Sequence, residues 1–241
     1  MSVPPFHWWR TVFVLIPLVS LYTIVLGVLS LVAGLFDRRG MWPHRAAQWW
    51  ASAIVLTSGV RIERRGQLPP PDQSCIFVAN HASIYDIPIL FTAIPRQLRI
   101  MAKAALGYVP FIGWHLRRSG HLLVDRKNPG AGIFKKMQRM TRHGASLIVF
   151  PEGSRTLDGQ VMKFKGGIFL LAIENGWPVV PVSVSGSRRV MPKGRLRVNP
   201  ARVTVTVHDR IETTGLTRDD ARGMATRVRD IVAREVDGRV E

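Results

Sequence analysis

Residues 75–94 read CIFVANHASIYDIPILFTAI and join a short apolar run to a helix. Cys75–Ala79 is short and apolar, which is typical of a strand buried on both faces of a sheet. Ser83–Ile94 follows it and is predicted to form a helix. A buried strand followed directly by a helix is the repeating unit of sheets that are covered by helices. This stretch therefore places the chain in the α/β class.

The same alternation of strands and helices continues to the C-terminus. The further strands are expected at Leu122–Val124, Leu147–Phe150, Val179–Val184 and Arg202–Val207, and the further helices at Gly130–His143, Ile168–Glu174 and Thr217–Val236. The polar stretch Arg61–Asp72 ends in three prolines and is predicted to be a stiff break before the globular part. We therefore expect residues 61–241 to form a single α/β domain with a mostly parallel or mixed sheet covered by helices.

The N-terminal part of the chain is apolar. Thr11–Phe36 contains no charged residue, and its 26 residues exceed the roughly 20 that a helix needs to cross a bilayer. A second uncharged run, Ala46–Val60, is too short to span and fits a helix that enters one leaflet or lies at the surface. A cleaved signal peptide and a buried core helix are the alternatives, and the first run is far longer than the apolar region of a signal peptide. We therefore predict that residues 1–60 are membrane-anchoring helices, which leaves open whether the first one spans or re-enters.

The chain is strongly basic, with 34 Lys and Arg against 16 Asp and Glu and a net charge of +18. Such a balance indicates an anionic partner, which is nucleic acid, anionic lipid or a phosphorylated substrate. No nucleic-acid reader motif is present, and the membrane run argues against that class. The charge instead favours a membrane-associated protein on the cytoplasmic face, which in a bacterium is the face of the inner membrane. The single cysteine excludes an intrachain disulfide, and no metal-ligand motif occurs, so no catalytic metal is expected.

The polar residues after the first buried strand have a pattern suited to proton transfer. His81 follows the strand directly, and Asp86 comes five residues later in the first turn of the next helix. A histidine in such a place acts as a general base when a carboxylate fixes its tautomer and stabilises the imidazolium. The structural alternative is that Ser83 caps the helix together with Asp86.

A second polar motif, Phe-Pro-Glu-Gly-Ser-Arg-Thr at residues 150–156, follows another expected strand. Gly153 lets the backbone approach a ligand, Ser154 supplies a hydroxyl, and Arg155 presents a fork that matches phosphate. The alternative is an ordinary turn between strand and loop with a solvated arginine.

Taken together, these two motifs resemble the first and third sequence blocks of the glycerolipid acyltransferases, the family typified by 1-acylglycerol-3-phosphate acyltransferase. The second block matches Leu122–Arg126, the fourth matches Val179–Val184, and Phe164–Gly167 resembles a further family segment. One departure lies near Lys103, where Ala104 and Ala105 replace a lysine and a glutamate of the family pattern.

The resemblance implies acyl transfer from acyl-CoA or an acyl carrier protein to the sn-2 hydroxyl of 1-acyl-glycerol-3-phosphate, with phosphatidic acid as the product. His81 is the implied general base and Asp86 orients it, without a cofactor. Backbone N–H groups near Gly153 or after His81 are the candidate oxyanion donors. The implied substrate-binding residues are Arg155, Glu152, Gly153, Ser154, Arg126, Lys165 and Lys103. Glu152 either holds its loop or contacts the glycerol hydroxyl.

Two alternatives stay open from the sequence. The alanines after Lys103 leave room for another lysolipid acceptor, such as an ornithine lysolipid. A protein of a different class, which binds anionic lipid without catalysis, would use only the positive charge of residues 61–241. The expected partners are a lysophospholipid acceptor, an acyl-CoA or acyl carrier protein, and anionic membrane lipids, but no nucleic acid.

Overall fold

The computed structural model of the protein describes residues 5–37, 40–125, 132–142 and 144–237. Their strands are β1 (Arg61–Arg65), β2 (Ile76–Ala79), β3 (Leu98–Lys103), β4 (Leu122–Val124), β5 (Ser146–Val149), β6 (Val179–Ser185) and β7 (Arg202–Val207). They form one sheet in the order β1-β7-β6-β2-β5-β3-β4, and every neighbouring pair is parallel except β6 and β7. This mixed sheet confirms the fold class expected from the sequence.

The central strands are buried along their whole length. Every residue of β2, β5 and β6 is enclosed, which is why these short strands consist mostly of apolar residues and carry no charged side chain. Strand β1 is mostly exposed, unlike the central strands. The sequence predicted a polar break over Arg61–Asp72, whereas the structure has a strand at Arg61–Arg65. It lies at the edge of the sheet, where charged residues are tolerated and discourage pairing with another chain.

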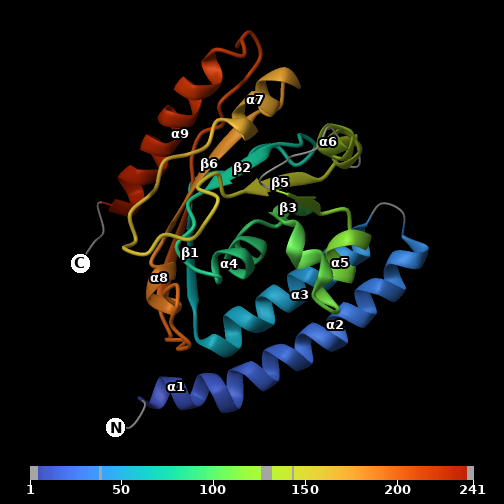
Figure 1. Cartoon of the computed structure of the whole chain (residues 1–241), viewed down its shortest axis with the longest axis vertical. Coiled ribbons are helices and arrows are strands. Elements are labelled where there is room, and N and C mark those ends of the chain that lie inside the picture. The colour runs from blue at the N-terminus through green and yellow to red at the C-terminus, as the bar shows by residue number, and fades with distance from the viewer. Residues whose placement is uncertain (1–4, 38–39, 126–131, 143, 238–241) are drawn as a thin grey trace.

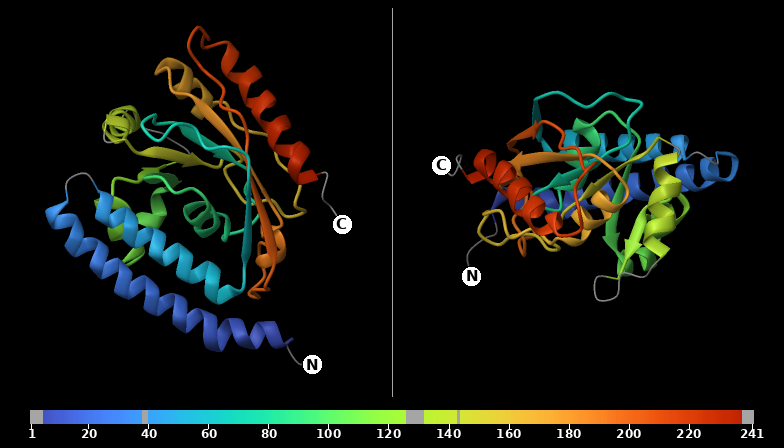
Figure 2. Two further views of the ribbon diagram at one scale, coloured as in Figure 1. Left: turned by 180° about the vertical axis from the view of Figure 1, so that it is seen from behind. Right: turned by 90° about the horizontal axis from the view of Figure 1, so that it is seen from above.

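Helices cover both faces of the sheet. They are α1 (Phe6–Arg10), α2 (Ile16–Phe36), α3 (Met41–Ser58), α4 (Asp86–Ala93), α5 (Ile112–Arg118), α6 (Gly132–Arg142), α7 (Gly167–Glu174), α8 (Ser187–Val190) and α9 (Asp220–Asp237). Helices α2 to α5 lie on one side of the sheet and α7 and α9 on the other, as Figures 1 and 2 show. Each side has its own apolar core, one around Phe77 and Ile89 and the other around Phe169 and Val228.

The N-terminal helix runs without a break from Phe6 to Phe36. A π-helical turn at Thr11–Leu15 joins α1 to α2 just before Pro17, which has no N–H to continue the regular hydrogen-bond ladder. The helix is long and apolar enough to cross a membrane, and many of its large apolar side chains are exposed. Such a helix suggests membrane association of this part of the molecule.

Helix α3 lies between α2 and α4 rather than apart from the body (Figure 1). Its residues Ala51, Ile54 and Val55 are buried and belong to the same core as strand residues of the sheet. The sequence predicted a helix in one leaflet or at the surface, and the structure shows that one face of α3 packs inside the protein. Trp49 and Leu56 on this helix are exposed. The division of the chain at residue 60 stays a prediction.

Candidate active site

The two polar motifs meet at the carboxyl ends of neighbouring strands. Strands β2 and β5 pair in parallel, so the segments that follow them leave the same edge of the sheet. The backbone N–H of His81 donates to Glu152 Oε1 at 2.6 Å, and the backbone N–H of Thr156 donates to the carbonyl of His81 at 2.9 Å. The structure therefore brings together two motifs that are far apart in the sequence.

His81 and Asp86 form a hydrogen-bonded pair. Asp86 Oδ2 lies 2.7 Å from His81 Nδ1 and also accepts the backbone N–H groups of Ala82 and Ser83 at 2.8 and 2.9 Å. The Asp86 side chain is fully buried, and these three donors hold it in one position. An ionised carboxylate only accepts hydrogen bonds, so Nδ1 carries the proton and Nε2 keeps the lone pair that a base needs. The ring of Phe150 stacks on His81 with centroids 4.2 Å apart and fixes its orientation.

Glu152 is a buried carboxylate that binds two backbone donors. Its Oε1 accepts the N–H of His81, and its Oε2 accepts the N–H of Met162 at 3.1 Å. Burial raises the pKa of Glu152 to about 7, while the two backbone hydrogen bonds act in the opposite direction. Both oxygens are engaged in holding the segments on either side of this residue.

The loop after Glu152 carries the expected phosphate-binding residues. Gly153 has a φ of +78°, and a Cβ at this position would lie 3.0 Å from Lys165 Nζ, so the glycine leaves space for the lysine. Ser154 and Lys165 are exposed and Arg155 is half-buried. Among the described residues, Arg155 and Lys165 have no ion-pair partner.

The two remaining expected residues are Lys103 and Arg126. Lys103 is exposed at the end of β3, and β3 runs parallel to β5, so Lys103 lies at the same edge of the sheet. Within the described parts of the chain, no hydrogen bond or ion pair joins Lys103 to the loop after Glu152. Arg126 lies outside the described residues.

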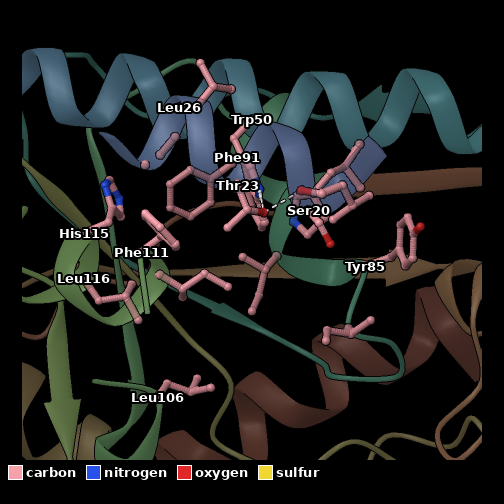
Figure 3. A pocket seen from close by; sticks show the side chains of 18 of the residues that line it. Ser20, Thr23, Leu26, Trp50, Tyr85, Phe91, Leu106, Phe111, His115 and Leu116 are labelled. Carbon is pink, nitrogen blue, oxygen red and sulfur yellow. Dashed lines mark hydrogen bonds between the residues drawn. The ribbon is translucent and has the colours of Figure 1, made fainter. Parts of the chain in front are cut away.

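An apolar cavity of about 470 Å³ lies between the N-terminal helix and helices α3, α4 and α5. Ile84 and Tyr85, which follow His81 closely in the chain, line it. Figure 3 shows Tyr85 on one side of the cavity and His115 and Phe111 near each other on the opposite side. Phe111 has a φ of +58°, which is rare for a residue other than glycine, and it packs against Gly27 of α2.

Sequence reasoning missed Lys193 and the cavity. The Nζ of Lys193 donates to the carbonyl of Arg155 at 2.8 Å, although Lys193 belongs to none of the motifs. The cavity wall comes from helices and loops spread over most of the chain, so no local pattern indicates it. Within the residues that the structure describes, no group of three or more His, Cys, Asp or Glu side chains is placed to hold a metal.

Comparison with known proteins shows the family of the chain. The family model described as Acyltransferase matches residues 60–185, which are more than half of the chain. A Chlamydomonas reinhardtii protein named as a 1-acyl-sn-glycerol-3-phosphate acyltransferase is 34% identical over 178 residues, 72% of this chain and 53% of that protein. A Saccharomyces cerevisiae protein of the same name is 31% identical over 209 residues, 84% of this chain and 69% of that protein.

A solved structure shares the fold over nearly the whole chain. The crystal structure of the 1-acyl-sn-glycerophosphate (LPA) acyltransferase PlsC from Thermotoga maritima has a TM-score of 0.74 and 25% identity, and the match covers 92% of this chain and 94% of that one. The chain spans about half the length of several curated relatives that it matches.

The fold and the site define a helix-covered α/β protein with a histidine–carboxylate pair at its strand ends. The chain belongs to the acyltransferase family, as its motifs predicted.

Proposed function

We propose that the protein transfers a fatty acyl group from an acyl thioester to the sn-2 hydroxyl of 1-acyl-glycerol-3-phosphate and forms phosphatidic acid. The observation that carries this proposal is the position of the His81–Asp86 pair. On one side, the carbonyl of His81 accepts the N–H of Thr156, which lies in the cationic loop after Glu152 that carries Arg155 and Lys165. On the other side, Ile84 and Tyr85 line the apolar cavity. A base between a cationic loop and an apolar cavity suits a substrate with a phosphate and a fatty chain.

The proposed chemistry is a direct transfer with His81 as the base. Nε2 takes the proton of the acceptor hydroxyl while that oxygen attacks the thioester carbonyl carbon. The tetrahedral adduct then collapses, the carbon–sulfur bond breaks, and the leaving sulfur takes the proton back from the imidazolium. Asp86 stabilises the positive ring in between, since its carboxylate lies 2.7 Å from Nδ1. A positioned base of this kind contributes roughly 10²–10⁴ in rate.

The backbone groups first considered as oxyanion donors are already engaged. The N–H groups of Ala82 and Ser83 donate to Asp86, and the N–H of Gly153 donates to the carbonyl of Phe150 at 3.1 Å. These three groups hold the site together in the structure. We therefore assign them to positioning rather than to the developing negative charge.

The acceptor phosphate is assigned to the loop after Glu152. Arg155 supplies the planar fork, Lys165 supplies a second positive charge, and Gly153 and Ser154 form the surface beside it. Glu152 is assigned to holding His81, because both of its oxygens accept backbone hydrogen bonds. Lys103 and Arg126 stay secondary candidates for contact with the phosphate or the glycerol.

The apolar cavity is assigned to a fatty acyl chain. Its size lies within the range of pockets that bind small molecules, and its wall is almost entirely apolar. The N-terminal helix forms part of that wall with Val19 and Leu26, so the cavity lies beside the segment suited to a membrane. This arrangement supports an enzyme held at a membrane surface. We place it at the cytoplasmic face because of its net charge of +18, which suits anionic headgroups, and we propose that it meets its lipid acceptor and the acyl-CoA or acyl carrier protein there without a cofactor.

The test is acyl transfer by the purified protein in liposomes. Lysophosphatidic acid and an ornithine lysolipid are offered separately, each with acyl-CoA and with acyl carrier protein, and His81→Ala serves as the blank. We expect turnover of lysophosphatidic acid that disappears in the variant while liposome binding is kept. Turnover of the ornithine lysolipid alone would show that this lipid, and not lysophosphatidic acid, is the acceptor. Undiminished turnover by His81→Ala would show that His81 is not the base.

A further inference from the structure

Residues 191–198, which follow α8, form a loop that touches both sides of the candidate site. The hydroxyl of Ser83 donates to the carbonyl of Met191 at 2.9 Å, which attaches the start of the loop to the segment after His81. Met191, Leu196 and Val198 line the apolar cavity. This loop therefore lies at the junction between the cavity and the catalytic pair, although no motif includes it.

Lys193 extends from this loop to the expected phosphate-binding segment. Its Nζ donates to the carbonyl of Arg155 at 2.8 Å, which uses one of the three protons of the ammonium group. The contact places a positive charge on the same segment as the Arg155 guanidinium. Lys193 is half-buried, so its charge is less screened than that of a fully exposed lysine.

The cations around this segment lack matching negative charge. Among the described residues, Arg155, Lys165 and Lys193 have no carboxylate within ion-pair distance. Asp158 lies in the loop after Glu152. Its carboxylate accepts hydrogen bonds from the hydroxyl of Thr156 at 2.6 Å and from the backbone N–H of Gln160 at 3.0 Å. Three unpaired cations on two facing segments favour an anion with more than one charged oxygen.

We infer that Lys193 binds the phosphate of the acceptor together with Arg155, and that it selects acceptors with a phosphate monoester. The inference rests on the proposed function and adds a substrate-binding residue to it. Arg155 supplies two parallel donors and Lys193 a compact charge, so together they neutralise a group that carries up to two negative charges. An acceptor with a zwitterionic headgroup gains less from this pair.

The experiment compares Lys193→Gln, Lys193→Arg and the matched control Arg195→Gln, which removes an exposed charge from the same loop. Steady-state rates are measured with lysophosphatidic acid and, separately, with the acyl donor varied. We expect Lys193→Gln to raise the KM for lysophosphatidic acid about tenfold or more, as for a lost hydrogen bond to a charged group. The donor KM and kcat change less than threefold. Lys193→Arg restores most of the affinity, and Arg195→Gln behaves like the wild type.

A purely structural role of Lys193 predicts a different result. Loss of the contact to the Arg155 carbonyl would lower kcat and raise both KM values alike, together with a lower thermal midpoint, and that pattern would overturn the inference. An unchanged KM for lysophosphatidic acid in Lys193→Gln would also overturn it while leaving the proposed function intact. Wild-type protein that acylates only an acceptor without phosphate would overturn both.

Discussion

Glu152 Oε1 lies 2.6 Å from the backbone nitrogen of His81, and this hydrogen bond connects the two motifs of the candidate site. The histidine is thus held at its ring by Asp86 and at its backbone by a second carboxylate. Each carboxylate comes from a different motif, so the position of His81 depends on both strand ends.

Glu152→Gln tests whether this carboxylate positions the base. The glutamine amide has one oxygen, which accepts a hydrogen bond, and one NH₂ group, which cannot accept one. It therefore loses one of the two hydrogen bonds that Glu152 accepts from the backbone N–H groups of His81 and Met162. At a pH of about 8, where most of the Glu152 carboxyl is ionised, we expect kcat to fall about ten- to hundredfold, the value for a lost hydrogen bond to a charged group, with both KM values nearly unchanged. Steady-state kinetics with each substrate varied measure this. A rise confined to the acceptor KM would instead assign Glu152 to the glycerol hydroxyl.

Arg155→Ala tests the phosphate contact. The side chain has no ion-pair partner among the described residues, so its removal is expected to change the free energy of unfolding by less than about 0.5 kcal/mol. The KM for lysophosphatidic acid is expected to rise at least tenfold, far more than the KM for the acyl donor. Equal effects on both KM values would show that Arg155 is not the phosphate ligand.

Ala47→Phe tests the assignment of the cavity to an acyl chain. Ala47 lines the cavity from α3, and a phenyl ring there would occupy part of its 470 Å³. We expect the preferred acyl donor to become shorter in a competition between chain lengths, with a loss of stability of about 1–3 kcal/mol at most. Leu56→Phe is the matched control, because Leu56 lies on the same helix and is exposed. Unchanged chain-length preference in Ala47→Phe would remove the cavity from the acyl-binding site.

The stability of the protein should fall in mild acid because of two buried histidines. The Nδ1 atoms of His44 and His121 accept the backbone N–H groups of Leu98 and Ile100 in β3, which only unprotonated nitrogen atoms can do. Burial lowers the pKa of His44 to about 4, with a further contribution from Arg99, and burial lowers the pKa of His121 well below 6.5.

The unfolded chain therefore binds these protons more tightly than the folded one. The contribution is fully present above pH 6.5 and is lost as the pH falls from 6.5 toward 4, by up to about 1.4 kcal/mol per pH unit for each histidine. Glu152 acts in the opposite sense, because its raised pKa adds stability as the pH falls from 7 to 4.5. Denaturant unfolding of the wild type and His121→Gln between pH 7 and 5 separates the two effects. We expect a shallower decline in the variant, and equal slopes would contradict this role of His121.

The sequence allowed the central strands and the contact between His81 and Asp86 to be predicted, for one physical reason. Strands β2, β5 and β6 are buried on both faces and consist mostly of apolar residues, and His81 and Glu152 come within three residues of the ends of β2 and β5. Strand β3 was not predicted, because buried Arg99 interrupts its apolar pattern. The guanidinium of that residue is satisfied by the carbonyls of Leu98 and Gly40, a contact that no local pattern shows.

The limits of sequence reasoning are clearest where distant segments meet. Lys193 reaches Arg155 through a contact between two loops, and its own neighbours in the chain carry no motif. The cavity wall combines residues such as Val19 and Phe91, which are apolar for packing reasons in any case. Only the assembled fold shows that these residues leave a space between them.

The N-terminal helix forms part of the cavity wall, and this has a practical consequence for anyone who prepares the protein. Leu15 of the N-terminal helix belongs to the same apolar core as the sheet, and Thr11 accepts a hydrogen bond from the backbone of Val198 at 2.8 Å. A shortened version that lacks the first 36 residues, made to avoid detergent, would expose that core to water and open the cavity along one side. Expression strategies should therefore keep the helix and solubilise it, because trimming it would remove part of the cavity wall itself.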